Sequence, residues 1–430
     1  MSNNSAWRVP AAVAAAVAAS IILSFALDGC NARPQSEIVF WAFGVEGEQV
    51  AKLIPEFERR NPGVSVRVQM IPWNAAHEKL LTAYASNSLP DLFQLGNTWI
   101  PEFQMLDALE NLDPLLRESA SLDDSVFFRG IWDTNVIDSA LYGIPWYVDT
   151  KVLFYRTDLL AAAGFPRAPA TWDEWFEVCR RIVQQRIAEY GVFFSVNNEW
   201  VPQVLMGVQK GSTLLKDQNM YGDFSGAEFR EAMRTFREFF VQGLAPVRTG
   251  QIVNIYQGIA DRSFAMFISG PWSIGEFRKR MPPDLQDKWM TAPLPGPEGA
   301  PGLSLAGGSS LVMLRSTPKK AEVWKLMEYL AEPGVQVEFY GLSGDLPSRV
   351  EAWKSPVLAG NRYAGAILEQ LRHVVATPKV PEWEQIAQKV RELTELITME
   401  RMTVEEATTE LDRAVDLILE KRRWMVRHAE

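Results

Sequence analysis

Over residues 37–70, the spacing of apolar side chains changes from a strand pattern to a helical pattern and back to a strand pattern. Residues 37–43, EIVFWAF, are apolar and β-branched enough for a buried strand, and residues 64–70, VSVRVQM, alternate with period two. Between them, residues 50–57 carry apolar side chains at i, i+3, i+4 and i+7, which predicts a helix that Asn-Pro-Gly at 61–63 ends. A strand, a helix and a strand in this order predict a right-handed βαβ unit in a largely parallel sheet.

Helical and strand-like patterns continue to alternate along the chain. Thr171 and Glu174 form a predicted capping box ahead of an apolar stripe that includes Cys179. The other segments are predicted as helices over 77–86, 100–109, 225–243 and two parts of 382–423, the second capped by Thr403 and Glu406, and as a strand over 90–95. These elements favour an α/β fold.

Two segments depart from these simple periods. Residues 141–160, LYGIPWYVDTKVLFYRTDLL, are apolar, aromatic and charged at once. Residues 281–302 are dense in proline and glycine, as expected of a functional loop or of a connection that crosses between lobes.

The first thirty residues differ from the rest of the chain. Residues 10–27 are uncharged and alanine-rich, which is typical of an export signal, with a weakly apolar membrane anchor as the alternative. They end in Leu-Asp-Gly-Cys, which resembles the lipobox of bacterial lipoproteins and makes Cys30 the expected lipidated residue. Asp28 departs from the usual small or uncharged residue, so a plain cleaved signal is the other alternative. We assign residues 1–30 to this signal and 31–36 to a tether.

Composition limits the remaining classes. A chain of 430 residues is longer than one hydrophobic core usually supports, so two lobes are expected. The formal net charge of −10 predicts no face for nucleic acid. Cys179 is the one cysteine besides Cys30, and we predict a core residue rather than a disulfide. The three histidines have no metal-ligand spacing, so neither a metal nor a cofactor is predicted.

Several local motifs, in a fixed order, resemble the sugar-binding family of extracellular solute-binding proteins that serve ABC importers. They are HEKLLTAYASNSLPDLFQLG, the stretch 141–160 continued by AGFPRAPATWDEW, FAMFISGPWSIGEF, APLPGPEG, GGSSLVMLRSTPKKAEVWKLMEYL and GLSGDLPSRVEAW. Together they cover roughly residues 37–360. The resemblance implies a maltose-binding-protein-like fold of class II type, in which two lobes with mostly parallel sheets close on a ligand.

The resemblance also implies where the lobes divide. Residues 37–147 and 295–331 are expected in lobe 1, and residues 148–294 and 332–430 in lobe 2. Residues 141–160 would then contain the first segment that crosses between the lobes, and the proline-rich run the second.

A sugar ring offers apolar faces to aromatic side chains and hydroxyls to polar ones. Trp272 matches a family position that stacks on sugar, Trp146 is the preferred second platform, and Asp149 is a hydroxyl acceptor. Other candidates follow strands, where open α/β sheets place ligands, or belong to motifs near the family's cleft. These are Phe43, Glu46, Asn97, Trp99, Gly308, Ser309, Asp345 and Arg349.

We therefore predict a monomeric binding protein, not an enzyme, which is anchored through lipid on Cys30 to the outer face of the membrane. Its expected partners are a carbohydrate, with an oligosaccharide as the expected kind, and an ABC permease with its ATPase. A binder of glycerol phosphate or another non-sugar solute is the nearest alternative. A secreted glycoside hydrolase with paired carboxylates is the alternative from another class, and a lipoprotein that only scaffolds partners would need no cleft aromatics.

Overall fold

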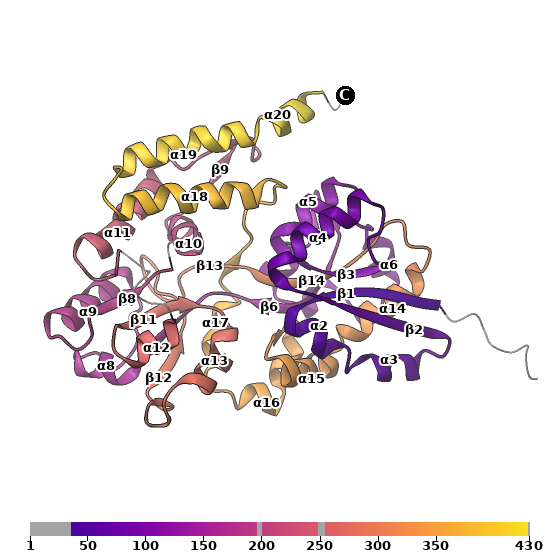
Figure 1. The fold of residues 1–430 in the computed structure, drawn as a ribbon, viewed down its shortest axis with the longest axis horizontal. Coiled ribbons are helices and arrows are strands. Elements are labelled where there is room, and N and C mark those ends of the chain that lie inside the picture. Colours follow the sequence, from indigo (N-terminus) through magenta and orange to yellow (C-terminus); the bar gives the residue numbers. More distant parts are fainter. Residues whose placement is uncertain (1–35, 196–199, 248–253, 429–430) are drawn as a thin grey trace, which may run out of the picture.

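The computed structural model describes residues 36–195, 200–247 and 254–428. The predicted export signal, Cys30 and the predicted tether up to residue 35 lie outside the described residues. Figure 1 shows two lobes side by side, one built around β1, β3 and β14 and the other around β8, β11 and β12. The predicted α/β two-lobe arrangement is confirmed.

The first lobe contains a sheet whose strands lie in the order β15–β6–β14–β3–β1–β2. The strands are β1 (Ser36–Phe43), β2 (Val64–Ile71), β3 (Leu92–Gly96), β6 (Ile144–Asp149), β14 (Gly307–Met313) and β15 (Leu346–Pro347). Strand β1 pairs in parallel with β2 and β3, as the βαβ pattern predicts. The pairs β14–β3, β14–β6 and β15–β6 are antiparallel. The sheet is therefore mixed rather than mostly parallel.

The single helix predicted between β1 and β2 is two helices, α2 (Gly44–Val50) and α3 (Ile54–Arg60). Pro55 lies in the first turn of α3. Proline has no amide hydrogen and cannot continue a helix that began before it, so the chain restarts at this point.

The second lobe contains a sheet in the order β12–β7–β11–β8. Its strands are β7 (Val152–Arg156), β8 (Tyr190–Phe193), β11 (Phe264–Ser269) and β12 (Trp289–Ala292). Only the β11–β8 pair of this sheet is parallel, and β7 is antiparallel to both β11 and β12. The proline-rich run therefore begins inside the second lobe and contributes strand β12 before it crosses.

Two crossing segments join the lobes. Strand β6 belongs to the first sheet and β7 to the second, so the chain crosses at Thr150 and Lys151. The return crossing ends at β13 (Ser304–Leu305), which pairs with β16 (Val374–Val375). The Thr150 hydroxyl donates to Ser304 Oγ at 2.9 Å, and the Lys151 amide donates to the same oxygen at 3.2 Å. The two crossings are thus bonded to each other and form one hinge.

The segment after β14 differs from the expected division. Helix α15 (Pro333–Ser343) packs Val335 and Phe339 into the core of the first lobe, and β15 pairs with β6. The expected boundary assigned residues 332–430 to the second lobe, whereas the structure places this part of them with the first sheet. The sequences of the apolar helix α15 and of the two-residue strand β15 do not indicate which of the two lobes they pack against.

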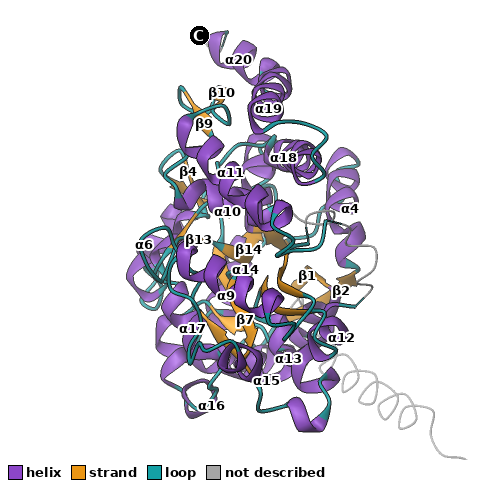
Figure 2. Ribbon diagram, turned by 90° about the vertical axis from the view of Figure 1, so that its left-hand side faces the viewer, coloured by secondary structure: helices purple, strands orange, loops and turns teal. Residues whose placement is uncertain are grey.

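Helices cover the sheets, as Figure 2 shows. Besides α2, α3 and α15, the α-helices of the described residues are α4 (Trp73–Ala85), α5 (Ile100–Met105), α6 (Asp113–Glu118), α7 (Arg129–Asp133), α8 (Thr157–Ala162), α9 (Trp172–Gln184), α10 (Val201–Gln209), α11 (Ala227–Val241), α12 (Ile255–Ala260), α13 (Trp272–Arg280), α14 (Lys320–Leu330), α16 (Pro356–Ala359), α17 (Ala364–Gln370), α18 (Trp383–Thr398), α19 (Val404–Ile418) and α20 (Glu420–Arg427). Two hairpins with strands of two residues each are also present: β4 (Val136–Ile137) pairs with β5 (Ala140–Leu141), and β9 (Leu215–Lys216) pairs with β10 (Tyr221–Gly222). Among the described residues, no helix has the length and apolar character needed to cross a bilayer.

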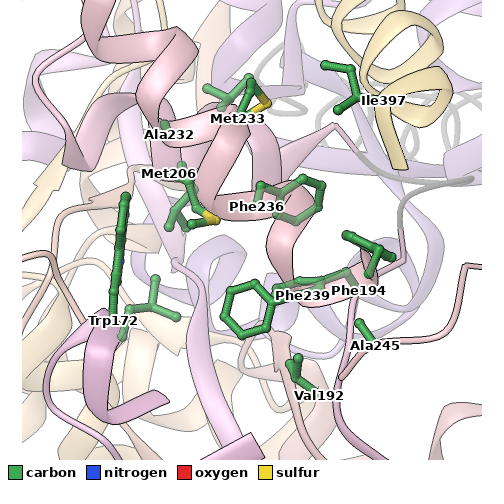
Figure 3. Close-up of a cluster of buried hydrophobic side chains, with 14 of the residues drawn as sticks. Trp172, Val192, Phe194, Met206, Ala232, Met233, Phe236, Phe239, Ala245 and Ile397 are labelled. Atoms are coloured by element: carbon green, nitrogen blue, oxygen red, sulfur yellow. The ribbon is translucent and has the colours of Figure 1, made fainter. Parts of the chain in front are cut away.

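The largest core cluster lies in the second lobe, between α9, α10, α11 and the C-terminal helices. Figure 3 shows Met206 of α10 meeting Phe236 and Phe239 of α11, with Ile397 of α18 nearby. Cys179 is fully buried in this cluster, where burial raises the pKa of its thiol well above the usual range. Thr403 and Glu406 form the predicted capping box.

Candidate functional site

A pocket of about 370 Å³ lies where the two lobes meet. This volume falls in the range of small-molecule sites. The second lobe contributes Pro271 and Trp272, and the first lobe with its crossing strand contributes the others. The lining residues are Glu46, Trp73, Tyr147, Val148, Asp149, Pro271, Trp272, Gly308 and Asp345.

Two tryptophans from different lobes line the pocket and remain accessible. Trp73 begins α4 and is 39% exposed, and Trp272 begins α13 and is 45% exposed. The Trp73 ring packs edge-on against Phe43, with centroids 5.0 Å apart. It also lies against Gly44, where an added Cβ would approach Trp73 Cδ1 to 2.8 Å. The glycine, which has φ +45°, therefore lets the chain leave β1 beneath the indole.

Glu46 accepts hydrogen bonds from two neighbours that line the same pocket. Trp73 Nε1 donates to its carboxylate at 3.2 Å, and the Tyr147 hydroxyl donates to Oε1 at 3.0 Å. Tyr147 is itself held by Gln94 Nε2 and by Ser309 Oγ, each at 3.0 Å from its hydroxyl oxygen. Burial, followed by the charge of Glu46, raises the pKa of Tyr147. The phenol is thus a fixed, neutral donor.

Asp149, at the end of β6, faces the pocket with only part of its carboxylate paired. Lys151 Nζ lies 3.6 Å from Oδ2, whereas Oδ1 is buried with no hydrogen-bond partner among the described residues. Burial raises the pKa of Asp149 in spite of the nearby ammonium. The same ammonium lies 4.2 Å from the centre of the Trp272 ring, a cation–π contact that links the hinge to the aromatic of the second lobe.

Asp345 completes the polar lining, just before β15. Burial, followed by the charges of Glu46 and later Asp149, raises its pKa to about 7. Its amide donates to Ser343 Oγ at 3.1 Å. Three carboxylates from separate segments therefore meet in one pocket with one nearby lysine.

The raised pKa of Asp345 gives a stability prediction. Because the folded chain holds this proton up to about pH 7 and the unfolded chain releases it near the ordinary 3.8, the contribution of Asp345 to stability falls as pH rises between these values. We expect Asp345→Asn to raise the free energy of unfolding by about 1 to 3 kcal/mol at about pH 8 and to change it little near pH 4. Urea denaturation at both pH values measures the difference. A variant less stable than the parent at about pH 8 would contradict the raised pKa of Asp345, because it would show that the ionised carboxylate is stabilising.

Gly308 brings β14 close to the neighbouring strand at the pocket wall. It has φ +118°, and an added Cβ would lie 2.2 Å from the carbonyl oxygen of Tyr147. Any side chain would push β14 away from β6 and so displace Tyr147. Gly308 therefore allows the close pairing of β14 with β6 at the pocket wall.

Trp146, which is predicted from the sequence as an aromatic platform, does not line the pocket. Trp146 is 1% exposed and stacks on Phe339 with centroids 4.7 Å apart in the core of the first lobe. Alternation along β6 gives the neighbouring Tyr147 the place at the pocket wall. The tryptophan is a core residue.

Arg349 and Asn97 also lie away from the pocket lining. The guanidinium of Arg349 donates to the carbonyls of Ser121 and Ala331 and lies over the Phe127 ring, so it holds loops of the first lobe together. Asn97 is buried, and its amide is within 3.5 Å of the Ala306 carbonyl beside the second crossing. Both assignments as direct ligand contacts are corrected to structural positions.

Phe43, Ser309 and Trp99 lie behind the lining residues. Phe43 and Trp99 pack against Trp73, and Ser309 bonds to Tyr147. They therefore position side chains of the pocket and do not line it.

Four lining residues were absent from the predicted site: the aromatic Trp73 and Tyr147, and the apolar Val148 and Pro271. Trp73 follows β2 as Glu46 follows β1, so the rule that ligands bind beyond the carboxyl ends of strands would have found it. The alternation along β6 restricted the choice between Trp146 and Tyr147 but gave no sign of which faced the cleft. Among the described residues, no group of three histidine, cysteine, aspartate or glutamate side chains could hold a metal ion.

Comparison with known proteins identifies the class. Residues 44–337, more than half of the chain, match the family described as bacterial extracellular solute-binding protein, and the chain belongs to that family. The predicted family and the two-lobe fold are thereby confirmed.

Individual relatives agree with this assignment. The structure of the sugar-binding protein MalE from the phytopathogen Xanthomonas citri is 45% identical, has a TM-score of 0.88 and covers 91% of this chain and 100% of its own. An ABC transporter solute-binding protein from Thermotoga lettingae, solved with α-D-tagatose, is 27% identical with a TM-score of 0.73, covering 89% of this chain and 100% of its own. The diacetylchitobiose-binding protein DasA of Streptomyces coelicolor is 26% identical over 346 residues, 78% of each chain.

Proposed function

We propose that this chain captures a carbohydrate in the pocket between its lobes, outside the cytoplasm, and delivers it to the permease of an ABC importer. The observation that carries the proposal is the pairing, in one interlobe pocket, of two accessible tryptophans with three carboxylates. The indole faces suit the C–H faces of a sugar ring, and the carboxylates accept bonds from its hydroxyls. The sugar-binding relatives named above support the same ligand class.

The arrangement also supports closure on the ligand. Trp272 belongs to the second lobe and Trp73 to the first, so one ring held by both would favour the closed state over the open one. The bonded crossings at Thr150 and Ser304 provide a hinge for that movement. A permease that recognises the closed form would then receive only loaded protein.

A thermal-shift screen of residues 31–430 tests the function. Mono- and oligosaccharides, polyols and glycerol phosphates are added singly, and each ligand that raises the melting temperature is recovered by chromatography. We expect a carbohydrate that stabilises the protein and is recovered intact. Recovery of a cleaved sugar would contradict the proposal and favour a hydrolase, for which the raised pKa of Asp345 would suit a general acid. Stabilisation by glycerol phosphates alone would contradict the carbohydrate assignment.

We further propose that the protein is exported and anchored as a monomer through lipid on Cys30. The extracellular description of the family and the lipobox-like residues 27–30 support this. Cys30→Ala is expected to move the protein from the membrane fraction to the soluble exported fraction, because it removes the acceptor of the lipid. Fractionation with mass spectrometry of the N-terminal peptide measures this, and Cys179→Ala is the matched control. A Cys30→Ala protein that stays with the membrane would contradict lipid anchoring.

A further inference from the structure

We infer that this pocket selects its carbohydrate by charge and binds best a sugar that carries a protonated amino group. The inference rests on the proposed function and concerns the same pocket. It follows from the balance of charges and hydrogen-bond donors among the lining side chains.

The charges in the pocket are mostly negative. Glu46, Asp149 and Asp345 line it together, and none of the described lining residues is basic. Asp345 is partly protonated near pH 7, and a cation beside it would favour its ionised form. Lys151 lies beside the lining, but its ammonium already contacts Asp149 and the Trp272 ring. An anionic solute would therefore meet like charges in a partly desolvated site, where such repulsion is strong.

The lining also has more acceptors than free donors. Two side-chain donors of the lining, Trp73 Nε1 and the Tyr147 hydroxyl, both donate to Glu46, and the accessible indole N–H of Trp272 is the other side-chain N–H of the described lining. Asp149 Oδ1 remains without a partner, and no ion pair joins Asp345 to a base in the described part of the chain. The ligand must therefore supply donors for two carboxylates.

A sugar ammonium meets both requirements. It donates three hydrogen bonds, which are charge-assisted when carboxylates accept them, and it reduces the repulsion among Glu46, Asp149 and Asp345. Burial, followed by the charges of Glu46 and Asp149, raises the pKa of Asp345. A neutral sugar supplies hydroxyl donors without the charge, and an anionic sugar adds repulsion. The expected order of affinity is therefore amino sugar, neutral sugar, anionic sugar.

Isothermal titration with matched sugars tests this order at about pH 7, where sugar amines are still largely protonated. The monosaccharide probes are glucosamine, N-acetylglucosamine, glucose and glucuronate, and the β-1,4 disaccharide probes are chitobiose with free amines, diacetylchitobiose and cellobiose. Within a set, the skeleton is constant and the charge changes. We expect the free amine to bind roughly tenfold more tightly than the neutral members, the difference between charge-assisted and neutral hydrogen bonds. Glucuronate should show no measurable heat.

A variant separates charge from shape. Asp345→Asn should reduce the preference for the amine over the neutral sugar, whereas Asp284→Asn, an exposed aspartate outside the lining, should leave it unchanged. Equal or tighter binding of the neutral members, or an unchanged preference in Asp345→Asn, would overturn the inference while the proposed function stands. Binding of none of these sugars, together with no carbohydrate hit in the thermal-shift screen, would overturn the proposed function as well.

Discussion

Replacing both Trp73 and Trp272 with alanine is expected to weaken carbohydrate binding by about 2 to 5 kcal/mol, because each indole provides an aromatic stack and buried apolar area worth roughly 1 to 3 kcal/mol. The two side chains come from different lobes, so their loss also removes contacts that favour closure. The single variants should each show part of the effect, and a double-mutant cycle would show whether the two rings hold one sugar. Isothermal titration with the sugar found in the screen measures all four proteins.

Trp424→Ala is the matched control for that experiment. Trp424 is 61% exposed on α20 and does not line the pocket. Its replacement should leave the affinity unchanged. If the double variant binds as tightly as the parent, the aromatic pocket is not where the sugar binds.

Trp146→Ala is expected to lower the free energy of unfolding by about 3 to 5 kcal/mol, the range for truncating a large buried aromatic. The ring is enclosed by Phe40, Tyr147 and Phe339, and the cavity left behind would lie between β6 and α15. Urea denaturation measures the change. Trp272→Ala, which truncates an accessible indole, should alter stability by less than about 1 kcal/mol.

These two variants distinguish the core tryptophan from the pocket tryptophan. Trp146→Ala should affect stability, and Trp272→Ala should affect binding. A Trp146→Ala protein with normal stability and lost affinity would contradict the assignment of Trp146 to the core and would restore it as a platform.

Periodicity predicted much of the fold because each pattern reflected a local cause. The βαβ unit from β1 to β2, the helix capped by Thr171 and the capping box of Thr403 with Glu406 all depend on spacing and on nearby hydrogen bonds. The mixed direction of both sheets and the position of α15 depend on pairings between segments far apart in the chain, which local patterns do not record.

Site residues that directly follow the end of a strand could be predicted from the sequence. Site residues within a strand could not, because the sequence does not show which face of the strand points into the cleft. Glu46 follows a strand, and Trp272 and Asp345 were identified by motif. Trp146 and Tyr147 are adjacent on β6, so their side chains point to opposite faces of the sheet. A prediction that assigns the wrong face to the strand therefore exchanges the core residue and the pocket residue. Arg349 lies in the same motif as Asp345, but the chain turns between them and directs the guanidinium toward buried carbonyls.

A crystal structure of residues 31–430 with the stabilising sugar bound tests the central claim most directly. We expect the sugar to lie between the lobes, with an indole face of Trp73 or Trp272 against a ring. Its hydroxyl or amino groups should bond to Glu46, Asp149 or Asp345. Density for the sugar elsewhere, such as the surface groove of Arg234, Arg237 and Glu405 between α11 and α19, with this pocket free of ligand, would contradict it.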